Sequence, residues 1–254
     1  MRVIINADDC GINASVNQHI NEAIREGKIT STTIMANMDD IDGAFSLYEK
    51  YKEFVSFGVH LNLTEGKPLL KSKILLDFGY YQEQNGELFF CGERAERYRY
   101  KSLPRIIQSE LYKELSAQIS KVQEGGVKIS HLDSHHHIHT SLSLMGVLAE
   151  LSKNKNILKI RNIRNYVPTL HSYMARRMWP VISKLYNRQY LMSDFFAIYD
   201  EFFANMDWRK IKEGQTIELM IHPGNPGESF RREEELMYKI TYPQNFELIN
   251  YNML

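Results

Sequence analysis

The sequence has few of the features that mark secreted, membrane-bound or nucleic-acid-binding proteins. Only two cysteines occur, Cys10 and Cys91, so no disulfide framework is indicated and a reducing compartment is favoured. The 31 basic and 31 acidic residues cancel, whereas a nucleic-acid or anionic-membrane partner would require a basic excess. No apolar run reaches about 18 residues, and the opening residues indicate a strand rather than a signal peptide. We therefore expect a cytoplasmic protein without nucleic-acid or membrane partners.

Composition and length indicate a single α/β domain. The chain of 254 residues is 43% hydrophobic and 24% charged, as ordinary globular proteins are. Because α/β barrels often have this length, we expect one domain over residues 1–254. Two irregular insertions are expected: residues 64–101 resemble a long loop, and residues 165–205 look mostly helical.

Short apolar runs alternate with amphipathic stretches along the rest of the chain, which is typical of parallel strands joined by helices. The first helix is expected to begin near Asn13 or Ser15 and to end at Gly27. A last helix and a closing strand are expected over roughly residues 230–254. The other predicted helices cover residues 104–124 and 142–153, and the predicted strands cover residues 3–7, 31–37, 55–63, 127–133, 157–161 and 216–222.

Side chains that bind metals or move protons stand where the predicted strands end. Because the carboxyl ends of parallel strands meet at one edge, residues far apart in the chain can converge there. Two neutral imidazoles and one carboxylate suit Zn²⁺ or another first-row divalent ion and leave coordination positions open, which is a catalytic layout. The groups concerned are Asp8 and Asp9, His60, the run "HLDSHHHIH" at residues 131–139, and His222.

Within this set, different residues suit different roles. Asp9, His60 and His135 are the candidate metal ligands. Asp8 would stand beside the cation, remain ionised and accept a proton. His222 precedes a Pro-Gly turn and is the candidate general acid. The remaining candidates, for substrate binding or for support of the ligands, are His131, Asp133, His137, His139 and Arg161.

Each of these residues alone also has an ordinary structural explanation. Histidine-rich loops are often only solvated, paired aspartates after a strand are often helix N-caps, and a histidine on a strand is often a hydrogen-bonded core residue. We expect His136 to point into solvent and Cys10 to be a small buried filler rather than a metal-binding thiolate. The recurrence of such groups at successive strand ends favours the joint functional interpretation.

Five segments together resemble one known family. They are "INADDCGIN", "GKITSTTIMAN", "GVHLNLTEGKPL", "HLDSHHHIH" and "ELMIHPG", and they occur in this order between residue 3 and about residue 225. In these segments the chain resembles the YdjC-like carbohydrate deacetylases, which include chitooligosaccharide deacetylase. The resemblance implies a distorted (β/α) barrel, similar to a TIM barrel and related to the polysaccharide deacetylases, and often a homodimer. It also implies Asp9, His60 and His135 as metal ligands and Asp8 as the base; Cys10 departs from the phenylalanine usual at that position.

The resemblance further implies removal of N-acetyl groups from an acetylated oligosaccharide of the diacetylchitobiose type. The cofactor would be one divalent ion, Mg²⁺ or Zn²⁺, with Co²⁺, Ni²⁺ or Mn²⁺ also compatible. Two alternatives remain. A metal-dependent sugar isomerase or aldolase would often need a lysine or a second acidic base at the rim, and no such lysine is evident. A non-catalytic metal-binding protein would favour a closed, fully protein-ligated site.

Overall fold

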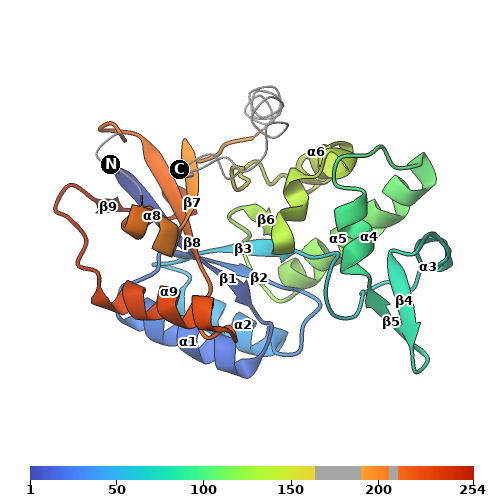
Figure 1. The fold of residues 1–254 in the computed structure, drawn as a ribbon, viewed down its shortest axis with the longest axis horizontal. Coiled ribbons are helices and arrows are strands. Elements are labelled where there is room, and N and C mark those ends of the chain that lie inside the picture. Colours follow the sequence, from blue (N-terminus) through green and yellow to red (C-terminus); the bar gives the residue numbers. More distant parts are fainter. Residues whose placement is uncertain (164–189, 206–210) are drawn as a thin grey trace.

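The computed structural model describes residues 1–163, 190–205 and 211–254 (Figure 1). Most of the segment predicted to be helical at 165–205 therefore lies outside the described residues. The main sheet is entirely parallel and has the order β6-β3-β2-β1-β8-β7, with β9 beside the beginning of β1. Its strands are β1 Arg2–Cys10, β2 Ser31–Ile34, β3 Ser56–Leu61, β6 Leu132–Ser134, β7 Phe195–Ile198, β8 Thr216–Ile221 and β9 Glu247–Leu248.

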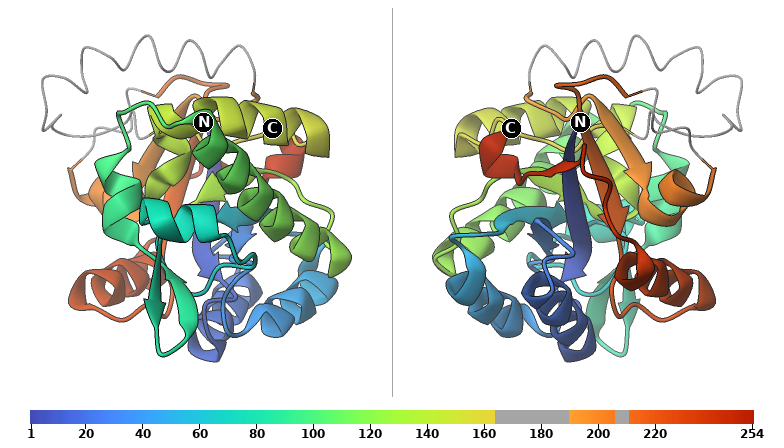
Figure 2. Two further views of the ribbon diagram at one scale, coloured as in Figure 1. Left: turned by 90° about the vertical axis from the view of Figure 1, so that its right-hand side faces the viewer. Right: turned by 90° about the vertical axis from the view of Figure 1, so that its left-hand side faces the viewer.

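The sheet curls into a distorted barrel, as predicted. Two isolated parallel bridges, Leu132 with Ile160 and Lys159 with Leu191, continue the curl beyond β6. Figure 2 shows the sheet enclosed by helices, with both marked chain ends at the end of the barrel where β1 begins. The functional strand ends therefore lie at the opposite end, which is where parallel barrels carry their sites.

The helices on the outside of the sheet form for reasons visible in the sequence. The Asn13 side chain accepts a hydrogen bond from the Val16 backbone N–H and thus caps α1, as predicted. Gly27 has a φ of 64°, a conformation that glycine adopts without strain, and the chain turns there towards β2. The longer helices are α1 Ala14–Arg25, α2 Ile41–Tyr51, α5 Arg105–Glu124, α6 Met145–Lys155, α8 Tyr199–Asn205 and α9 Glu228–Lys239.

The excursion at 64–101, expected to be a loop, contains several short elements. They are α3 Lys73–Phe78, the antiparallel hairpin β4 Tyr81–Gln84 and β5 Glu87–Phe90, and α4 Gly92–Arg97. In Figure 1, α3 and the hairpin project from the side of the molecule opposite β9. The buried Glu114 carboxylate on α5 accepts hydrogen bonds from the backbone of Leu69 and Leu70 and ties the excursion to the barrel. Elements this short give little periodicity, so the sequence pattern did not reveal them.

Elsewhere the sequence pattern missed one helix and predicted several elements wrongly or too long. Helix α2 was not predicted, and residues 195–198 form the strand β7 rather than helix. Regular pairing in the predicted strand 127–133 is confined to β6, and residues 157–161 contribute only bridges. A short apolar run does not distinguish a buried strand from a helix, which explains the error at β7.

Among the helices in the described residues, none is both long and apolar enough to cross a membrane.

Candidate metal centre and active site

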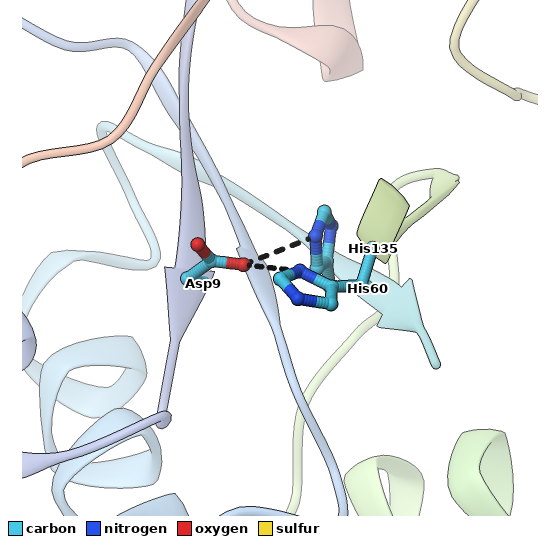
Figure 3. Close-up of side chains that lie close together, drawn as sticks. All are labelled: Asp9, His60 and His135. Carbon is cyan, nitrogen blue, oxygen red and sulfur yellow. Dashed lines mark hydrogen bonds and ion pairs between the residues drawn. The ribbon is translucent and has the colours of Figure 1, made fainter. Parts of the chain in front are cut away.

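The three predicted metal ligands converge at the carboxyl ends of β1, β3 and β6 (Figure 3). Oδ1 of Asp9 lies 3.2 Å from Nε2 of His60 and 3.0 Å from Nδ1 of His135. One ligand atom from each residue lies within 4.8 Å of the other two, and all three residues are buried. A first-row divalent cation fits between atoms of this kind at this spacing. The residues present thus match the cation that the sequence predicts.

An irregularity in β1 brings both aspartates to the same cavity. Successive side chains of a regular strand point to opposite faces, so Asp8 and Asp9 would normally diverge. The register between β1 and β2 shifts between Ala7 and Cys10, and Asp9 has a φ of 65°. Aspartate tolerates this left-handed conformation better than most side chains do. The shift therefore directs two adjacent carboxylates to one place.

His60 is supported by a fully buried carboxylate. Its Nδ1 lies 2.7 Å from Oδ1 of Asp133, and because a carboxylate only accepts, Nδ1 carries the hydrogen and Nε2 faces Asp9. Burial by itself would lower the pKa of His60, but the negative charges of Asp133 and Asp8 outweigh it and raise that pKa to about 10. Asn225 donates a hydrogen bond to Oδ2 of Asp9 over 3.1 Å, which orients this carboxylate.

His135 is supported from the opposite side by Glu65, in the loop after β3. Nε2 of His135 lies 2.9 Å from Oε2 of Glu65, whose side chain is 53% exposed. Its Nδ1 is thereby left to face Asp9. Burial would lower the pKa of His135, but the hydrogen bonds with Asp9 and Glu65 raise it. His136 is exposed, as expected, but it also has partners at the cavity: its ring lies 4.0 Å from that of His135, and its Nδ1 lies 3.0 Å from Oγ1 of Thr64.

Asp8 is held by Arg161 behind the cavity. The guanidinium donates to both Asp8 oxygens, over 2.7 and 2.6 Å. The same group contacts Asp133 at 2.9 Å and Glu218 at 2.8 Å, and it is fully buried. Burial would raise the pKa of Asp8, but the charge and hydrogen bonds of Arg161 hold it well below its usual value. Asp8 is therefore ionised at neutral pH and has a fixed orientation.

His222 faces Asp8 across the cavity and is supported by Glu233 on α9. Its Nδ1 and its backbone N–H lie 3.3 and 2.9 Å from Oε2 of Glu233. Its Nε2 lies 4.0 Å from Oδ2 of Asp8. Burial would lower the pKa of His222, but the hydrogen bond with Glu233 and the charge of Asp8 raise it. The protonated form, which a general acid requires, is thereby favoured.

A cavity of about 550 Å³ contains these groups and separates the predicted residues into two sets. Asp8, Asp9, His60, His135, His137 and His222 line it. His131, Asp133, His139 and Arg161 do not, and each contacts interior residues instead. The rest of the lining is Ile12, Asn13, Glu65, Ser134, His136, Met220, Asn225, Pro226 and Phe230. Of the residues predicted for substrate binding or support, only His137 can therefore contact a substrate in this cavity.

The histidine loop is strained and is clamped by the excursion. His136 and His137 have φ values of 50° and 52°, in the left-handed region. Arg99, just after α4, donates to the backbone oxygens of His136 and His137 over 2.8 and 3.0 Å. Such strain persists where surrounding contacts overdetermine the backbone.

Burial lowers the pKa of His137 to about 3, so its ring is neutral.

Cys10 behaves as the filler that was expected. It is completely buried, and burial raises the pKa of its thiol to about 12, so the thiolate is not populated at neutral pH. Its Sγ lies 3.5 Å from Oδ1 of Asn17, and Cys10 belongs to none of the residue groups in the described chain that could hold a metal ion.

The profile of the YdjC-like protein family matches residues 2–248 of this chain. The chain belongs to that family. This YdjC-like protein is 30% identical, over 98% of its length and 100% of the relative's, to a protein of Halalkalibacterium halodurans named carbohydrate deacetylase. A protein of the same name from Vibrio cholerae is 30% identical over 100% of this chain and 96% of its own.

The fold of this YdjC-like protein also occurs in a solved structure. A crystal structure of an Enterococcus faecalis protein, with a suggested role in cellobiose-phosphate cleavage, superposes with a TM-score of 0.71. The match covers 99% of this chain and 98% of the other, at 23% identity. At that identity the likeness establishes the shared fold.

Proposed function

We propose that this protein is a metal-dependent deacetylase that removes N-acetyl groups from amino sugars, such as chitooligosaccharides of the diacetylchitobiose type. The observation that supports the proposal is that three candidate metal ligands and two candidate proton-transfer residues line one cavity. Asp9, His60 and His135 face the same space as an ionised Asp8 and a His222 with a raised pKa. The names of the curated relatives support the same reaction.

The proposed cofactor is one divalent cation held by Asp9, His60 and His135. When bound, it would acidify a water molecule and polarise the acetamide carbonyl. The mixed nitrogen and oxygen ligands favour Zn²⁺, Co²⁺, Ni²⁺ or Mn²⁺ over Mg²⁺, which prefers oxygen ligands. Three protein ligands leave coordination positions open, as in catalytic sites.

The chain's own residues supply the proton transfers. The Asp8 carboxylate, held by Arg161, accepts the proton of the attacking water. Nε2 of His222 donates a proton to the nitrogen of the leaving amine, because an amine anion does not leave at neutral pH. Their separation of 4.0 Å lets both groups reach one reacting centre. The two groups act in opposite directions because Arg161 and Glu233 shift their pKa values apart.

Two other functions are less compatible with this cavity. An isomerase or aldolase often uses a lysine or a second acidic base at the rim. Within the described part of the chain no lysine lines this cavity, and the acidic Glu65 at its exposed side is already paired with Nε2 of His135. A non-catalytic metal-binding protein would favour a closed ligand set and would gain nothing from Asp8 and His222 beside it. Acetate release distinguishes deacetylation from both.

The experiment is an acetate-release assay on diacetylchitobiose with the metal content measured in parallel. We expect activity in the metal-loaded protein, loss of activity after chelation, and recovery on adding Zn²⁺ or Co²⁺. Asp8→Asn should reduce kcat by roughly 100-fold or more while the metal stays bound. The matched control is Asp77→Asn, an exposed aspartate on α3 paired with Lys73. Full activity after verified metal removal would contradict the mechanism.

The homodimer and the cytoplasmic location remain predictions. Light scattering of the purified protein tests the first, and fractionation of cells that produce it tests the second.

A further inference from the structure

The interior of the barrel below the active site contains an unusual set of buried charges. Arg161 contacts three carboxylates, those of Asp8, Asp133 and Glu218. All four side chains are at most 3% exposed. A buried charged group is costly unless each of its hydrogen-bonding atoms is satisfied. The position of Asp8 therefore depends on how the other contacts of Arg161 are completed.

The donor to the far oxygen of Glu218 comes from the opposite end of the barrel. Oε1 of Glu218 accepts from Nε of Arg161 over 2.8 Å, and Oε2 accepts from the hydroxyl of Tyr251. Tyr251 belongs to a short 3₁₀ turn, Tyr251–Met253, which follows β9. A continuous series of hydrogen bonds thus runs from this turn through Glu218 and Arg161 to both oxygens of Asp8.

Tyr251 is fixed by every polar group that it has. Its backbone N–H donates to Oγ of Ser56 over 3.0 Å, at the beginning of β3, and its backbone oxygen accepts from Lys159 over 2.6 Å. Its ring is fully buried and stacks on His131, with centroids 3.5 Å apart and planes at 7°. A Cβ on Gly58 would come within 2.6 Å of the His131 ring, so β3 leaves room for this stack. The phenol is thus held in one orientation.

We propose that Tyr251 is a positioning residue for the catalytic base: through Glu218 and Arg161 it sets the orientation of the Asp8 carboxylate. The inference rests on the proposed deacetylation and extends it to a residue that does not line the cavity. Without the hydroxyl, Oε2 of Glu218 loses its donor, the carboxylate rotates or takes up a proton, and Nε of Arg161 loses a charged acceptor. The guanidinium is then free to tilt away from Asp8.

The test uses Tyr251→Phe, which keeps the stacked ring and removes the hydroxyl, and Glu218→Gln, which keeps the shape and removes the charge. We expect Tyr251→Phe to lower kcat by roughly tenfold, with KM and metal stoichiometry unchanged, because the lost interaction acts on the base. Glu218→Gln should lower kcat further. In the double variant kcat should equal that of Glu218→Gln, because both changes interrupt one series of contacts. If the fold losses of kcat in the two single variants multiply in the double variant, the two residues act independently and the proposal is overturned.

The matched control is Tyr81→Phe. The Tyr81 hydroxyl also contacts a buried carboxylate, that of Glu114, at 3.5 Å, but this pair supports the excursion and does not lead to Arg161. We expect a similar loss of thermal stability in both phenylalanine variants and a loss of kcat in Tyr251→Phe alone. Equal kcat in the two would mean that Tyr251 is purely structural and would overturn the proposal.

Crystal structures of the variants separate this inference from the proposed function. If the wild-type protein with bound metal releases no acetate, the deacetylase proposal fails, and the structures alone decide the role of Tyr251. A displaced Arg161 guanidinium that has lost a contact to Asp8 in Tyr251→Phe supports the inference. If Arg161 keeps both contacts to Asp8 and kcat is unchanged, the inference is overturned. If the protein has no measurable activity, two intact contacts alone overturn it.

Discussion

The two histidine ligands of the proposed metal stand in opposite surroundings. His60 is supported by Asp133, which is fully buried and shares Arg161 with Asp8, the proposed base. His135 is supported by Glu65, whose side chain is half exposed and comes from a loop. Water weakens a charge interaction at an exposed site and leaves a buried one strong. We therefore expect Asp133, on the buried side, to determine the charge and position of His60. Glu65, on the exposed side, should have a weaker effect on His135 and leave that side accessible to a substrate.

The largest expected effect is on the buried side, in Asp133→Asn. An amide in place of this carboxylate removes the charge that orients His60 and one of the three acceptors of Arg161. Metal affinity should fall about 10- to 100-fold, and kcat at saturating metal should fall as well because the base is also disturbed. Isothermal titration with Zn²⁺ and the acetate assay measure these effects, with Asp77→Asn as control. If this variant bound Zn²⁺ as tightly as the wild-type protein does, the buried Asp133 would support its histidine no more strongly than the exposed Glu65 does.

Metal binding should strengthen as pH rises, chiefly through the buried side. With its pKa raised to about 10, His60 carries a proton at neutral pH in the metal-free protein and must release it to bind a cation. Affinity should therefore rise between about pH 6 and pH 9, by roughly tenfold per unit for each proton released. Titrations in buffers of different ionisation enthalpy count the protons. Affinity independent of pH would show that metal binding displaces no proton from His60.

The smallest expected effect is on the exposed side, in Glu65→Gln. The glutamine amide can still contact Nε2 of His135, and solvent compensates for much of the lost charge. Metal affinity should fall by less than about tenfold. Glu87→Gln is the control, since this exposed glutamate pairs with Lys67 on the surface. A loss as large as that in Asp133→Asn would mean that exposure does not weaken this support.

The parts of the site that could be predicted are those carried by strand ends. Asp8 and Asp9 lie near the end of β1, His60 lies near the end of β3, and His135 follows β6, so a simple rule about parallel strands places them together. Two of the supporting residues, those of His135 and His222, obey no such rule. Glu65 lies in a loop, and Glu233 lies on a helix where an acidic residue is unremarkable.

Two further residues show how much signal the sequence contained. Glu218 interrupts a fully buried apolar strand, "TIELMI", and an acid in that setting is a detectable sign of an internal partner. Arg99 offered none, because its function is to bind two backbone oxygens 37 and 38 residues away, and nothing in their sequence marks that contact. Helix α2 did contain a signal that the prediction did not use, because Ile41, Ala44, Leu47 and Tyr48 recur at helical spacing and form its buried face.

The irregular backbone of β1 also limits which residues position 9 can accept. A φ of 65° disfavours β-branched and bulky side chains and suits glycine, asparagine and aspartate. Glycine has no ligand atom and asparagine has no charge. The backbone therefore narrows the choice at this position before any cation does, and exchanging Asp9 for glutamate to alter metal preference would strain the chain itself.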